Sequence, residues 1–370
     1  GSPCADMLTG DTTGNQLDGD AGNDQLNGGP GNDTLNGGTG EDTMTGGNGN
    51  DAYYVDHPGD IVSETSADLA SGGRDIVLSH LASYALTANV EDLRILATGP
   101  ADGTGNEFDN LLYAGEGDNM LDGGAGIDTV GYRFANSGVS VSLALAGVQA
   151  TGGSGSDTLI SIENLAGSAF ADTLTGNGSA NRLDGSSGND TLDGGGGVDT
   201  LIGGNGSDHY FVDQLGDLVN ETNTDPATGG NDTVHSSLSA YTLTANVENL
   251  RILAIGAANG TGNGLDNTLH AGSGNNVLDG GIGADTVSYA DAPSAITVSL
   301  ATAGAQATGG SSSDTLLGIE HLTGSAFADR LTGDSNANQL AALAGADTLT
   351  GGTGADTLLG GDGADLYYVD

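Results

Sequence analysis

The sequence has 370 residues with 68 Gly, no Trp and 4% aromatic residues, a composition that argues against the thick apolar core of an ordinary globular enzyme domain. Its 50 acidic residues against six basic ones give a formal net charge of -44, which excludes nucleic acid as a partner and disfavours anionic membrane surfaces. Because this self-repulsion opposes compaction, we expect folding to require bound cations, with a hard divalent metal as the obvious candidate.

Neither membrane insertion nor disulfide cross-linking is predicted. The longest apolar stretches, such as residues 139–148, are broken by Ser and Gly and are too short to span a bilayer. Residues 1–10 lack the basic start and the apolar run of a signal peptide. The single cysteine, Cys4, cannot form an intramolecular disulfide. We therefore look to the repeats of the chain for what stabilises its fold.

A nine-residue repeat begins at Gly19, where the chain reads GDAGNDQLN, GGPGNDTLN, GGTGEDTMT and GGNGNDAYY. Each copy has an Asp at the same place and an apolar residue two positions later, which gives the consensus GGxGxDxUx. The four Asp residues are Asp24, Asp33, Asp42 and Asp51.

A longer period of 157 residues is fixed by DAYYVD at Asp51, DHYFVD at Asp208 and DLYYVD at Asp365. Sequences between these points recur with it, so we expect rolls built from nonapeptides to alternate with other β-rich segments. In chain order the expected parts are a β-roll at 4–56, a β-rich segment at 57–104, a short degenerate roll at 105–130, a β-rich segment at 131–165, a β-roll at 166–213, a β-rich segment at 214–261, a short degenerate roll at 262–287, a β-rich segment at 288–322 and a β-roll at 323–370.

Each nonapeptide predicts a tight turn followed by a short strand. Six Gly-rich residues accommodate positive φ angles, and the middle residue of the strand points inward. Two nonapeptides then form a coil of about 18 residues, with two buried apolar side chains that contribute about 2 kcal/mol each. The backbone entropy lost is about 1 to 2 kcal/mol per residue, so burial alone cannot stabilise the coil. Asp carboxylates and Gly carbonyls in the turns are hard oxygen ligands that suit Ca²⁺.

Turns alternate between the two edges of such a solenoid, so Asp residues 18 positions apart should meet across neighbouring coils. Four such pairs are expected, in which Asp24 faces Asp42, Asp33 faces Asp51, Asp190 faces Asp208 and Asp347 faces Asp365.

The repeats GGPGNDTLN, GGTGEDTMT and GGGGVDTLI resemble the haemolysin-type calcium-binding repeats of the RTX exoproteins. The resemblance implies an all-β parallel β-roll, or β-solenoid, with interspersed segments outside the repeat, and several Ca²⁺ ions as cofactors. It implies that each ion is held by an Asp and two main-chain carbonyls from each of two turns. The first implied site combines Asp33 and the carbonyls of Gly29 and Gly31 with Asp51 and those of Gly46 and Asn48. The second combines Asp24 and the carbonyls of Asp20 and Gly22 with Asp42 and those of Gly37 and Thr39. The third combines Asp190 and the carbonyls of Ser186 and Gly188 with Asp208 and those of Gly203 and Asn205. The remaining candidate ligands are Asp60, Asp128, Asp199, Asp217, Asp285, Asp347, Asp356 and Asp365.

Departures from the repeat predict weaker turns. A neutral amide replaces the carboxylate at several positions, where we expect little or no binding; these are Asn15, Asn110, Asn119, Asn181, Asn267, Asn276 and Asn338. The stretch LAALAGAD has lost both leading glycines, which puts the turn of Asp347 in doubt. Acidic residues also continue the register beyond the recognisable repeats, at Asp60, Asp217, Glu163 and Glu320.

Segments between the rolls alternate apolar and polar residues, as at Val139, Val141 and Leu143, and predict strands. They either continue the solenoid as wider coils or form small β caps, and we favour continuation. The acids Asp56, Asp60 and Glu64, repeated as Asp213, Asp217 and Glu221, are either an additional calcium site or solvated strand ends. Tyr53, Tyr210 and Tyr367 are expected to fill the core at the end of each roll.

The sequence therefore predicts a calcium-binding repeat region of a type I-secreted bacterial exoprotein, located outside the cell or at its surface. We expect it to be disordered without calcium, to fold outside the cell and to act as a structural spacer, with flanking domains in a longer chain. One alternative is an adhesin or other ligand-binding surface. The other is an accessory region of a secreted hydrolase. No HExxH or Gly-x-Ser-x-Gly motif is present, so we expect no catalytic activity.

Overall fold

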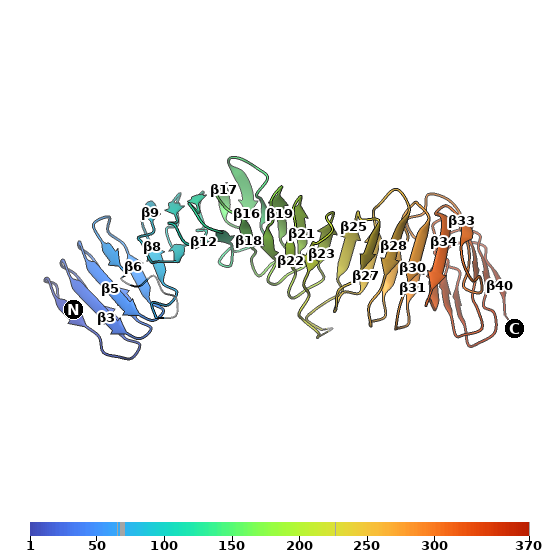
Figure 1. Ribbon diagram of the computed structural model, residues 1–370, viewed down its shortest axis with the longest axis horizontal. Helices are drawn as coiled ribbons and strands as arrows, with labels where there is room; N and C mark the ends of the chain where they lie inside the picture. The colour runs from blue at the N-terminus through green and yellow to red at the C-terminus, as the bar shows by residue number, and fades with distance from the viewer. Residues whose placement is uncertain (65, 67–70, 226, 370) are drawn as a thin grey trace. The chain divides into compact units, whose positions relative to one another are not determined.

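The computed structural model describes residues 1–64, 66, 71–225 and 227–369. The described chain is built from short β-strands, and it divides into two compact units, Gly1–Gly188 and Asn189–Asp370. Each unit is a parallel β-solenoid in which successive coils stack strand on strand, as β3 and β5 do at the start of the chain (Figure 1). Among these residues, no helix is long and apolar enough to cross a membrane.

In unit 1, two facing sheets form the first roll. One sheet has the order β1 (Met7–Thr9), β3 (Gln25–Pro30), β5 (Thr43–Asn48) and β7 (Ile61–Ser63). The opposite sheet runs through β2 (Gln16–Asp18), β4 (Thr34–Asn36), β6 (Ala52–Val55), β8 (Ile76–Ser79), β10 (Asp92–Ile95), β12 (Leu111–Tyr113), β14 (Thr129–Gly131), β18 (Asn164–Ala166) and β20 (Arg182–Asp184). This second sheet passes without interruption from the roll into β8 and β10, so the solenoid continues into the described residues of the segment that follows, as we favoured.

The remaining strands of unit 1 cover the far side of the later coils. They pair in the order β9 (Ser83–Ala85), β11 (Asp102–Thr104), β13 (Met120–Asp122) and β17 (Gly155–Ile160), with β16 (Gln149–Gly152) antiparallel to β17. A separate parallel pair joins β15 (Ser140–Ser142) to β19 (Thr173–Asn177). The predicted strand at Val139 to Leu143 is therefore confirmed, whereas the antiparallel hairpin departs from the purely parallel pattern.

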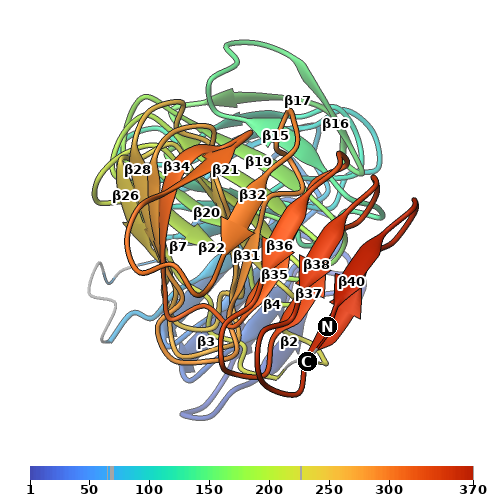
Figure 2. The same ribbon diagram turned by 90° about the vertical axis from the view of Figure 1, so that its right-hand side faces the viewer.

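Unit 2 repeats this arrangement. Its longest run of strands is β21 (Thr191–Gly195), β23 (His209–Val212), β25 (Thr233–Ser236), β27 (Asn249–Ile252), β29 (Thr268–His270), β31 (Thr286–Ser288), β35 (His321–Thr323), β37 (Gln339–Ala341) and β39 (Thr357–Leu359). Facing it are the pair β22 (Thr200–Ile202) and β24 (Leu218–Val219), the set β26 (Ala240–Thr242), β28 (Ala258–Thr261), β30 (Asn276–Asp279), β34 (Ser312–Leu317) and β33 (Gln306–Gly309), and the set β32 (Thr297–Ser299), β36 (Arg330–Thr332), β38 (Thr348–Thr350) and β40 (Leu366–Tyr368). Figure 2 shows β36, β38 and β40 side by side in one wall of this unit.

A narrow column of side chains between the two sheets forms the core. The middle residue of each strand points inward, so Leu26 pairs in register with Met44, and Leu35 pairs with Tyr53. All four are at most 2% exposed. Tyr210 is fully buried in the same way, which confirms the expectation for the first two rolls. For Tyr367 the expectation is wrong.

Tyr367 is 46% exposed because β40 is the last strand of its sheet, so only β38 packs beside it.

The glycines of the repeat are required by the geometry of the turn. A Cβ on Gly28, the first glycine before Asp33, would clash with the Oδ2 atom of that carboxylate. Gly29 and Gly31 have φ angles of +94° and +133°, in the region that side chains disfavour. The first glycine therefore makes room for the Asp, and the other two allow the chain to reverse.

Leu343 occupies the second-glycine position before Asp347, in the stretch that has lost its leading glycines. Its φ is +76°, a left-handed conformation that is unfavourable for a residue with a Cβ. The turn nevertheless forms, since Gly345 still has a φ of +145° and Asp347 is 1% exposed. The fold thus imposes the turn on a sequence that does not favour it.

We predict that Leu343→Gly raises the free energy of unfolding in 10 mM calcium by about 1 kcal/mol, because it relieves the left-handed strain. The Leu343 side chain is 43% exposed, so little burial is lost. Urea denaturation measures the change. As a matched control, Leu145→Gly replaces a leucine that is 57% exposed and has no positive φ; it should lower stability. A loss of stability in both variants would contradict the prediction.

Candidate functional site

A ladder of hydrogen bonds joins the Asp residues of successive coils. The Asp24 N–H donates to Asp42 Oδ1, and the Asp33 N–H donates to Asp51 Oδ1, each at 2.7 Å. The pairs Asp190–Asp208 (2.7 Å) and Asp347–Asp365 (3.0 Å) make the same contact. All four expected encounters between Asp residues 18 positions apart are thus confirmed, and each carboxylate receives the backbone of the preceding coil.

The other oxygen of these carboxylates lies buried. Eight Asp side chains of these turns are each at most 1% exposed, and the Oδ2 atom of each has no hydrogen-bond partner among the described residues. This holds for Asp24, Asp33, Asp42, Asp51, Asp128, Asp208, Asp285 and Asp347. A buried charged oxygen without a partner is strongly destabilising, so each of these atoms requires a cation or a proton.

Main-chain carbonyls of the same turns accept hydrogen bonds from the neighbouring coil. The Gly31 N–H donates to the carbonyl of Asn48 at 2.7 Å, and the Gly22 N–H donates to that of Thr39 at 2.9 Å. These carbonyls therefore lie between neighbouring turns, and a carbonyl oxygen has a second lone pair with which to bind a cation. Carboxylate and carbonyl oxygens together are the donor set that Ca²⁺ prefers.

The other proposed carbonyl donors lie in the same kind of turn. Gly29 and Gly188 have positive φ angles, of +94° and +128°. A Cβ on Gly37 would clash with the carboxylate of Asp42, and one on Gly46 or Gly203 would clash with Asp51 or Asp208. Asn205 accepts a hydrogen bond from the Asn223 amide at 2.6 Å through its side-chain oxygen, which leaves its carbonyl oxygen out of that contact.

The candidate ligands at the margins of the rolls are more open to solvent. Asp60 and Asp217 accept the N–H groups of Asp42 and Asp199, both at 3.1 Å. They thus belong to the ladder, as the register suggested, although they are only half-buried. Asp356 and Asp365 are half-buried as well, and Asp356 accepts the N–H of Asn338 at 2.9 Å.

The ladder also continues through Glu163 and Glu320. They accept the N–H groups of Asp128 and Asp285 at 2.8 and 2.9 Å.

In Asn-containing turns such as those of Asn119 and Asn276, the side-chain amide donates a hydrogen bond to a main-chain carbonyl of the preceding coil, although Asn276 Oδ1 has no partner among the described residues. The Asn119 side chain accepts the Gly115 N–H at 2.9 Å and donates its Nδ2 to the carbonyl of Ala101 at 2.8 Å. Asn276 donates to Ala258 in the same way, again at 2.8 Å. An amide therefore donates a hydrogen where the Asp carboxylate has only a lone pair, so a coil with Asn needs no cation to bridge the same gap.

A second way of satisfying the carboxylate occurs at Asp329. Its two oxygens accept the Ser325 N–H at 2.5 Å, the Ser325 hydroxyl at 2.8 Å and the Ile296 N–H at 2.9 Å. This Asp, which we had not proposed as a ligand, is hydrogen-bonded at both oxygens by Ser325 of its own turn and by Ile296 of the preceding coil. A buried Asp in this solenoid is thus a candidate metal ligand only where such donors are missing.

Two clusters of buried acids were missed by sequence reasoning. Asp51, Glu64 and Asp75 each offer a carboxylate oxygen within 4.8 Å of the others, and Asp208, Glu221 and Asp232 do the same. We had considered Glu64 and Glu221 only with Asp56, Asp60 and their copies. Asp75 and Asp232 lie 24 residues after their partners rather than 18, so the nine-residue register does not reach them. The signal that would have found them is the Gly-Gly pair that precedes each, with φ of +100° at Gly73 and +94° at Gly230.

Burial and neighbouring carboxylates raise the pKa values of the two Asp residues in each cluster. The pKa of Asp51 rises to about 6 and that of Asp75 to about 8, chiefly because of burial. Asp208 and Asp232 shift to about 6 and about 8 for the same reason. Because the folded-state values exceed the unfolded ones, these groups favour the cation-free fold at acid pH, and that contribution is lost as the pH rises through 8. At neutral pH a proton and a cation thus compete for the carboxylates of each cluster.

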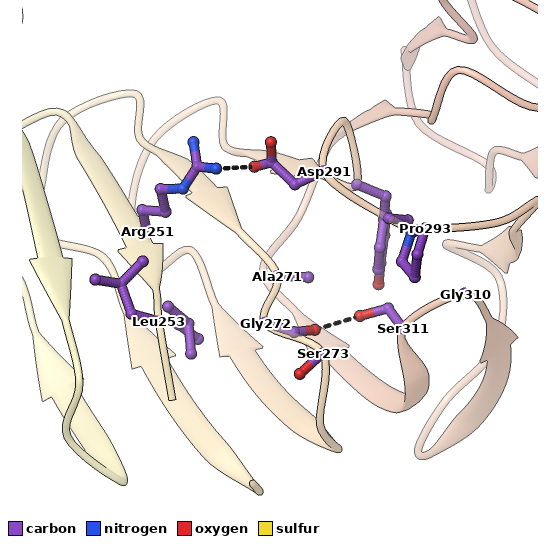
Figure 3. Close-up of a pocket in the computed structure, with 12 residues that line it drawn as sticks. Arg251, Leu253, Ala271, Gly272, Ser273, Asp291, Pro293, Gly310 and Ser311 are labelled. Atoms are coloured by element: carbon purple, nitrogen blue, oxygen red, sulfur yellow. Dashed lines mark hydrogen bonds and ion pairs between the residues drawn. The ribbon is translucent and has the colours of Figure 1, made fainter. Parts of the chain in front are cut away.

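A pocket of about 210 Å³ lies in unit 2 (Figure 3). Arg251 and Asp291 pair across its mouth, with 2.9 Å between Nη2 and Oδ2. Ser311 donates its hydroxyl to the carbonyl of Gly272 at 2.6 Å. Two pairs of polar groups in this pocket thus bind each other, and the Tyr289 hydroxyl, which also lines it, has no hydrogen-bond partner among the described residues.

Comparison with known families agrees with the geometry of the turns. The RTX calcium-binding nonapeptide repeat, in its four-copy form, matches stretches that together cover more than half of the chain. The matched residues are 5–35, 18–53, 103–130, 151–192, 175–210, 261–291, 314–349 and 342–370. They contain the turns of Asp33 and Asp51 in unit 1 and those of Asp190 and Asp208 in unit 2. No curated protein sequence matches the chain.

We predict that Asn119→Asp raises the calcium concentration at the midpoint of folding. The change replaces the amide donor to Ala101 with a buried carboxylate oxygen, which costs about 1 to 3 kcal/mol until a cation neutralises it. Asn136→Asp makes the same charge change at an exposed position and should leave the midpoint unchanged. A calcium titration followed by circular dichroism compares the two variants. Equal midpoints would show that the Asn119 amide is not the reason why this coil folds without a cation.

Proposed function

The chain belongs to the RTX calcium-binding nonapeptide repeat family, and on that premise we propose that it is a calcium-triggered folding module of a secreted bacterial exoprotein. In this proposal the chain leaves the cell unfolded by type I secretion, folds outside on binding several Ca²⁺ ions, and then acts as a rigid spacer within a longer protein. Calcium ions are its partners, and we propose neither nucleic-acid binding nor membrane insertion.

The proposal depends on one observation, the buried Oδ2 atoms of the repeat Asp residues. In the turns of Asp24, Asp33, Asp42, Asp51, Asp128, Asp208, Asp285 and Asp347 the backbone is already hydrogen-bonded, and this oxygen lacks a partner among the described residues. Removing a charge from water without compensation costs several kcal/mol, which is comparable with the whole stability of a domain. A folded roll at neutral pH is therefore favourable only when these oxygens bind cations.

Charge and concentration explain how such a chain senses its location. Without calcium, 50 acidic residues against six basic ones repel one another and favour the extended chain. Extracellular calcium modules bind with Kd of about 0.1 to 1 mM, so cytosolic calcium leaves the sites empty and millimolar calcium fills them. Each tenfold excess of calcium over Kd contributes about 1.4 kcal/mol per site. Coils that stabilise their neighbours make the transition steep.

A structural role, without catalysis, fits the same geometry. Buried titratable groups in the rolls sit at repeated turns, where each also receives a backbone hydrogen bond. In the pocket of unit 2, Arg251 pairs with Asp291, and the Ser311 hydroxyl donates to a main-chain carbonyl. We propose on these grounds that any enzyme activity of the parent protein belongs to another part of it.

A second candidate function, a ligand-binding surface, is favoured by one feature of unit 1. The Arg94 guanidinium carbon lies 3.4 Å from the ring centroid of Phe134, and Phe134 packs against Tyr113 with 5.4 Å between ring centroids. Aromatic rings beside a cation are common in sites that recognise other molecules. Unit 2 has Arg251 and Asp291 at the corresponding positions, so this surface is not a regular row.

Far-UV circular dichroism during a calcium titration, from chelator to about 10 mM, tests the folding switch. We expect a disordered spectrum in chelator and a cooperative change to β-structure with calcium. Magnesium at the same concentrations should not replace calcium, because it demands a tighter octahedral shell and dehydrates reluctantly. A chain that is fully β-structured in chelator would contradict the switch and would favour the ligand-binding surface.

A further inference from the structure

The two buried clusters of acids lie where each roll meets the next, wider coil. In unit 1, Asp51 precedes β6, Glu64 follows β7 and Asp75 precedes β8. Their carboxylate oxygens converge within 4.8 Å, and all three residues are buried, at 1%, 7% and 1% exposure. Three carboxylates at such distances repel one another strongly unless a positive charge lies between them.

Glu64 takes a place that belongs to glycine elsewhere in the roll. Gly28, Gly46 and Glu64 lie 18 residues apart, so Glu64 stands at the first-glycine position of the following coil. A Cβ on Gly46 would clash with Asp51 Oδ2 and Tyr53 Oη and would lie 2.5 Å from Glu64 Oε1, so all three atoms surround one point. At this coil the Glu64 carboxylate therefore supplies an oxygen atom at a position where an ordinary turn has only the main-chain atoms of a glycine.

A second observation is independent of the grouping of the acids. Asp51 uses Oδ1 to accept the Asp33 N–H, but its Oδ2 atom, which faces the Gly46 position beside Glu64, has no hydrogen-bond partner in the described chain. The available donors are already directed to Glu64, since the Tyr53 hydroxyl donates to Glu64 Oε1 and the Gly47 N–H reaches it at 3.3 Å. A fully buried anionic oxygen thus points into the cluster without a donor.

The same arrangement is built a second time, 157 residues later. Asp208, Glu221 and Asp232 converge within 4.8 Å, and Tyr210 donates its hydroxyl to Glu221 Oε2 at 2.9 Å. Asp208 Oδ2 is again without a partner in the described part of unit 2, and Asp208 is fully buried. Glu221 lies 18 residues after Gly203, as Glu64 does after Gly46. Neither Glu64 and Asp75 nor their copies fall within the residues that match the RTX repeat.

We propose that Asp51, Glu64 and Asp75 hold one calcium ion and that Asp208, Glu221 and Asp232 hold another, at three-carboxylate sites that share Asp51 and Asp208 with the nonapeptide turns and take their other two acids from outside the repeat. The proposal deepens the calcium-dependent folding proposed above and rests on it. Each site links the last regular coil of a roll to the first coil of the segment that follows.

The chemistry of the donors favours calcium over other common cations. Ca²⁺ accepts six to eight oxygen ligands with flexible geometry, and carboxylates bind it through one or both oxygens. Three carboxylates leave the occupied site with a net charge of -1, and the Tyr hydroxyls fix the Glu side chains beside it. Lanthanide ions have similar oxygen chemistry and a higher charge, so Tb³⁺ should occupy the same sites and report their distance from Tyr53 and Tyr210.

The first experiment counts the calcium ions bound to the folded full-length chain, by native mass spectrometry at a calcium concentration well above the folding midpoint. The variant Glu64→Gln/Glu221→Gln removes one carboxylate from each site and should bind two ions fewer than the wild type. Glu107→Gln/Glu116→Gln makes the same charge change at two exposed positions and should keep the wild-type count. An unchanged count in the first variant, or an equal loss in both, would overturn the proposal.

A second measurement applies even if the Gln variant does not fold. Terbium bound beside Tyr53 and Tyr210 should emit on excitation of tyrosine. Because the chain has no Trp, only tyrosine can transfer the absorbed energy to the ion. Tyr53→Phe/Tyr210→Phe keeps the carboxylates but removes the two tyrosines that would transfer energy to terbium at these sites, and it should reduce this emission at least twofold. Emission equal to that of the wild type would count against the sites.

The two proposals fail in different ways. A wild-type chain that keeps the same β-structure with and without calcium would refute the folding switch, while the ion count of the Gln variant would still decide the three-carboxylate sites. A chain that folds with calcium but loses no ions on Glu64→Gln/Glu221→Gln would keep the switch and reject these sites.

Discussion

The fold depends on a carboxylate whose two oxygens have different roles. In the described turns whose Asp has a buried Oδ2 atom without a partner, the Oδ1 atom accepts an N–H of the preceding coil at about 2.7 Å, as Asp51 does from Asp33. The other lies buried without a donor. The first contact sets the stacking of coils, and the second leaves a charge that must be neutralised. Since each coil buries only two apolar side chains, this electrostatic requirement decides whether the roll is stable.

Variation along the chain follows from how each turn meets that requirement. Asn119 and Asn276 replace the missing cation with an amide hydrogen, and Asp329 receives two donors from Ser325. We therefore expect the same solenoid to contain coils that need calcium and coils that do not. The ladder of hydrogen bonds includes both kinds of coil, because each step needs only a side-chain oxygen in the turn of the next coil and does not depend on how many residues that coil contains. Its steps span 16 residues from Asp75 to Glu91 and 38 residues from Asn119 to Asp157.

Much of this architecture could be predicted from the sequence, because the repeat encodes it locally. The inward residues Leu26 and Met44, the encounters of Asp residues 18 apart and the continuation of the ladder to Asp60 all follow from a fixed register of nine. Asp75 could not be found in this way, since six additional residues separate it from Asp51. Its place depends on how a wider coil closes, which is a property of the assembled sheets.

Other features also depend on tertiary context. The antiparallel pairing of β16 with β17 has no counterpart in the nonapeptide pattern, and the strained φ of Leu343 is imposed by neighbouring coils. The ligand roles of individual carbonyls, such as those of Gly29 and Asn48, stay predictions. Their turns have the positive φ angles and the hydrogen bonds between coils that the repeat requires.

Amide hydrogen exchange in chelator and in calcium tests the central claim most directly, because the N–H groups of Asp24 and Asp33 are themselves donors in the ladder. Mass spectrometry of peptides from residues 19–56 would report their protection. The account predicts that calcium slows exchange of these amides at least tenfold, because the carboxylates that accept them are stable in place only when a cation neutralises them. Equal protection of these peptides in chelator and in calcium would contradict it.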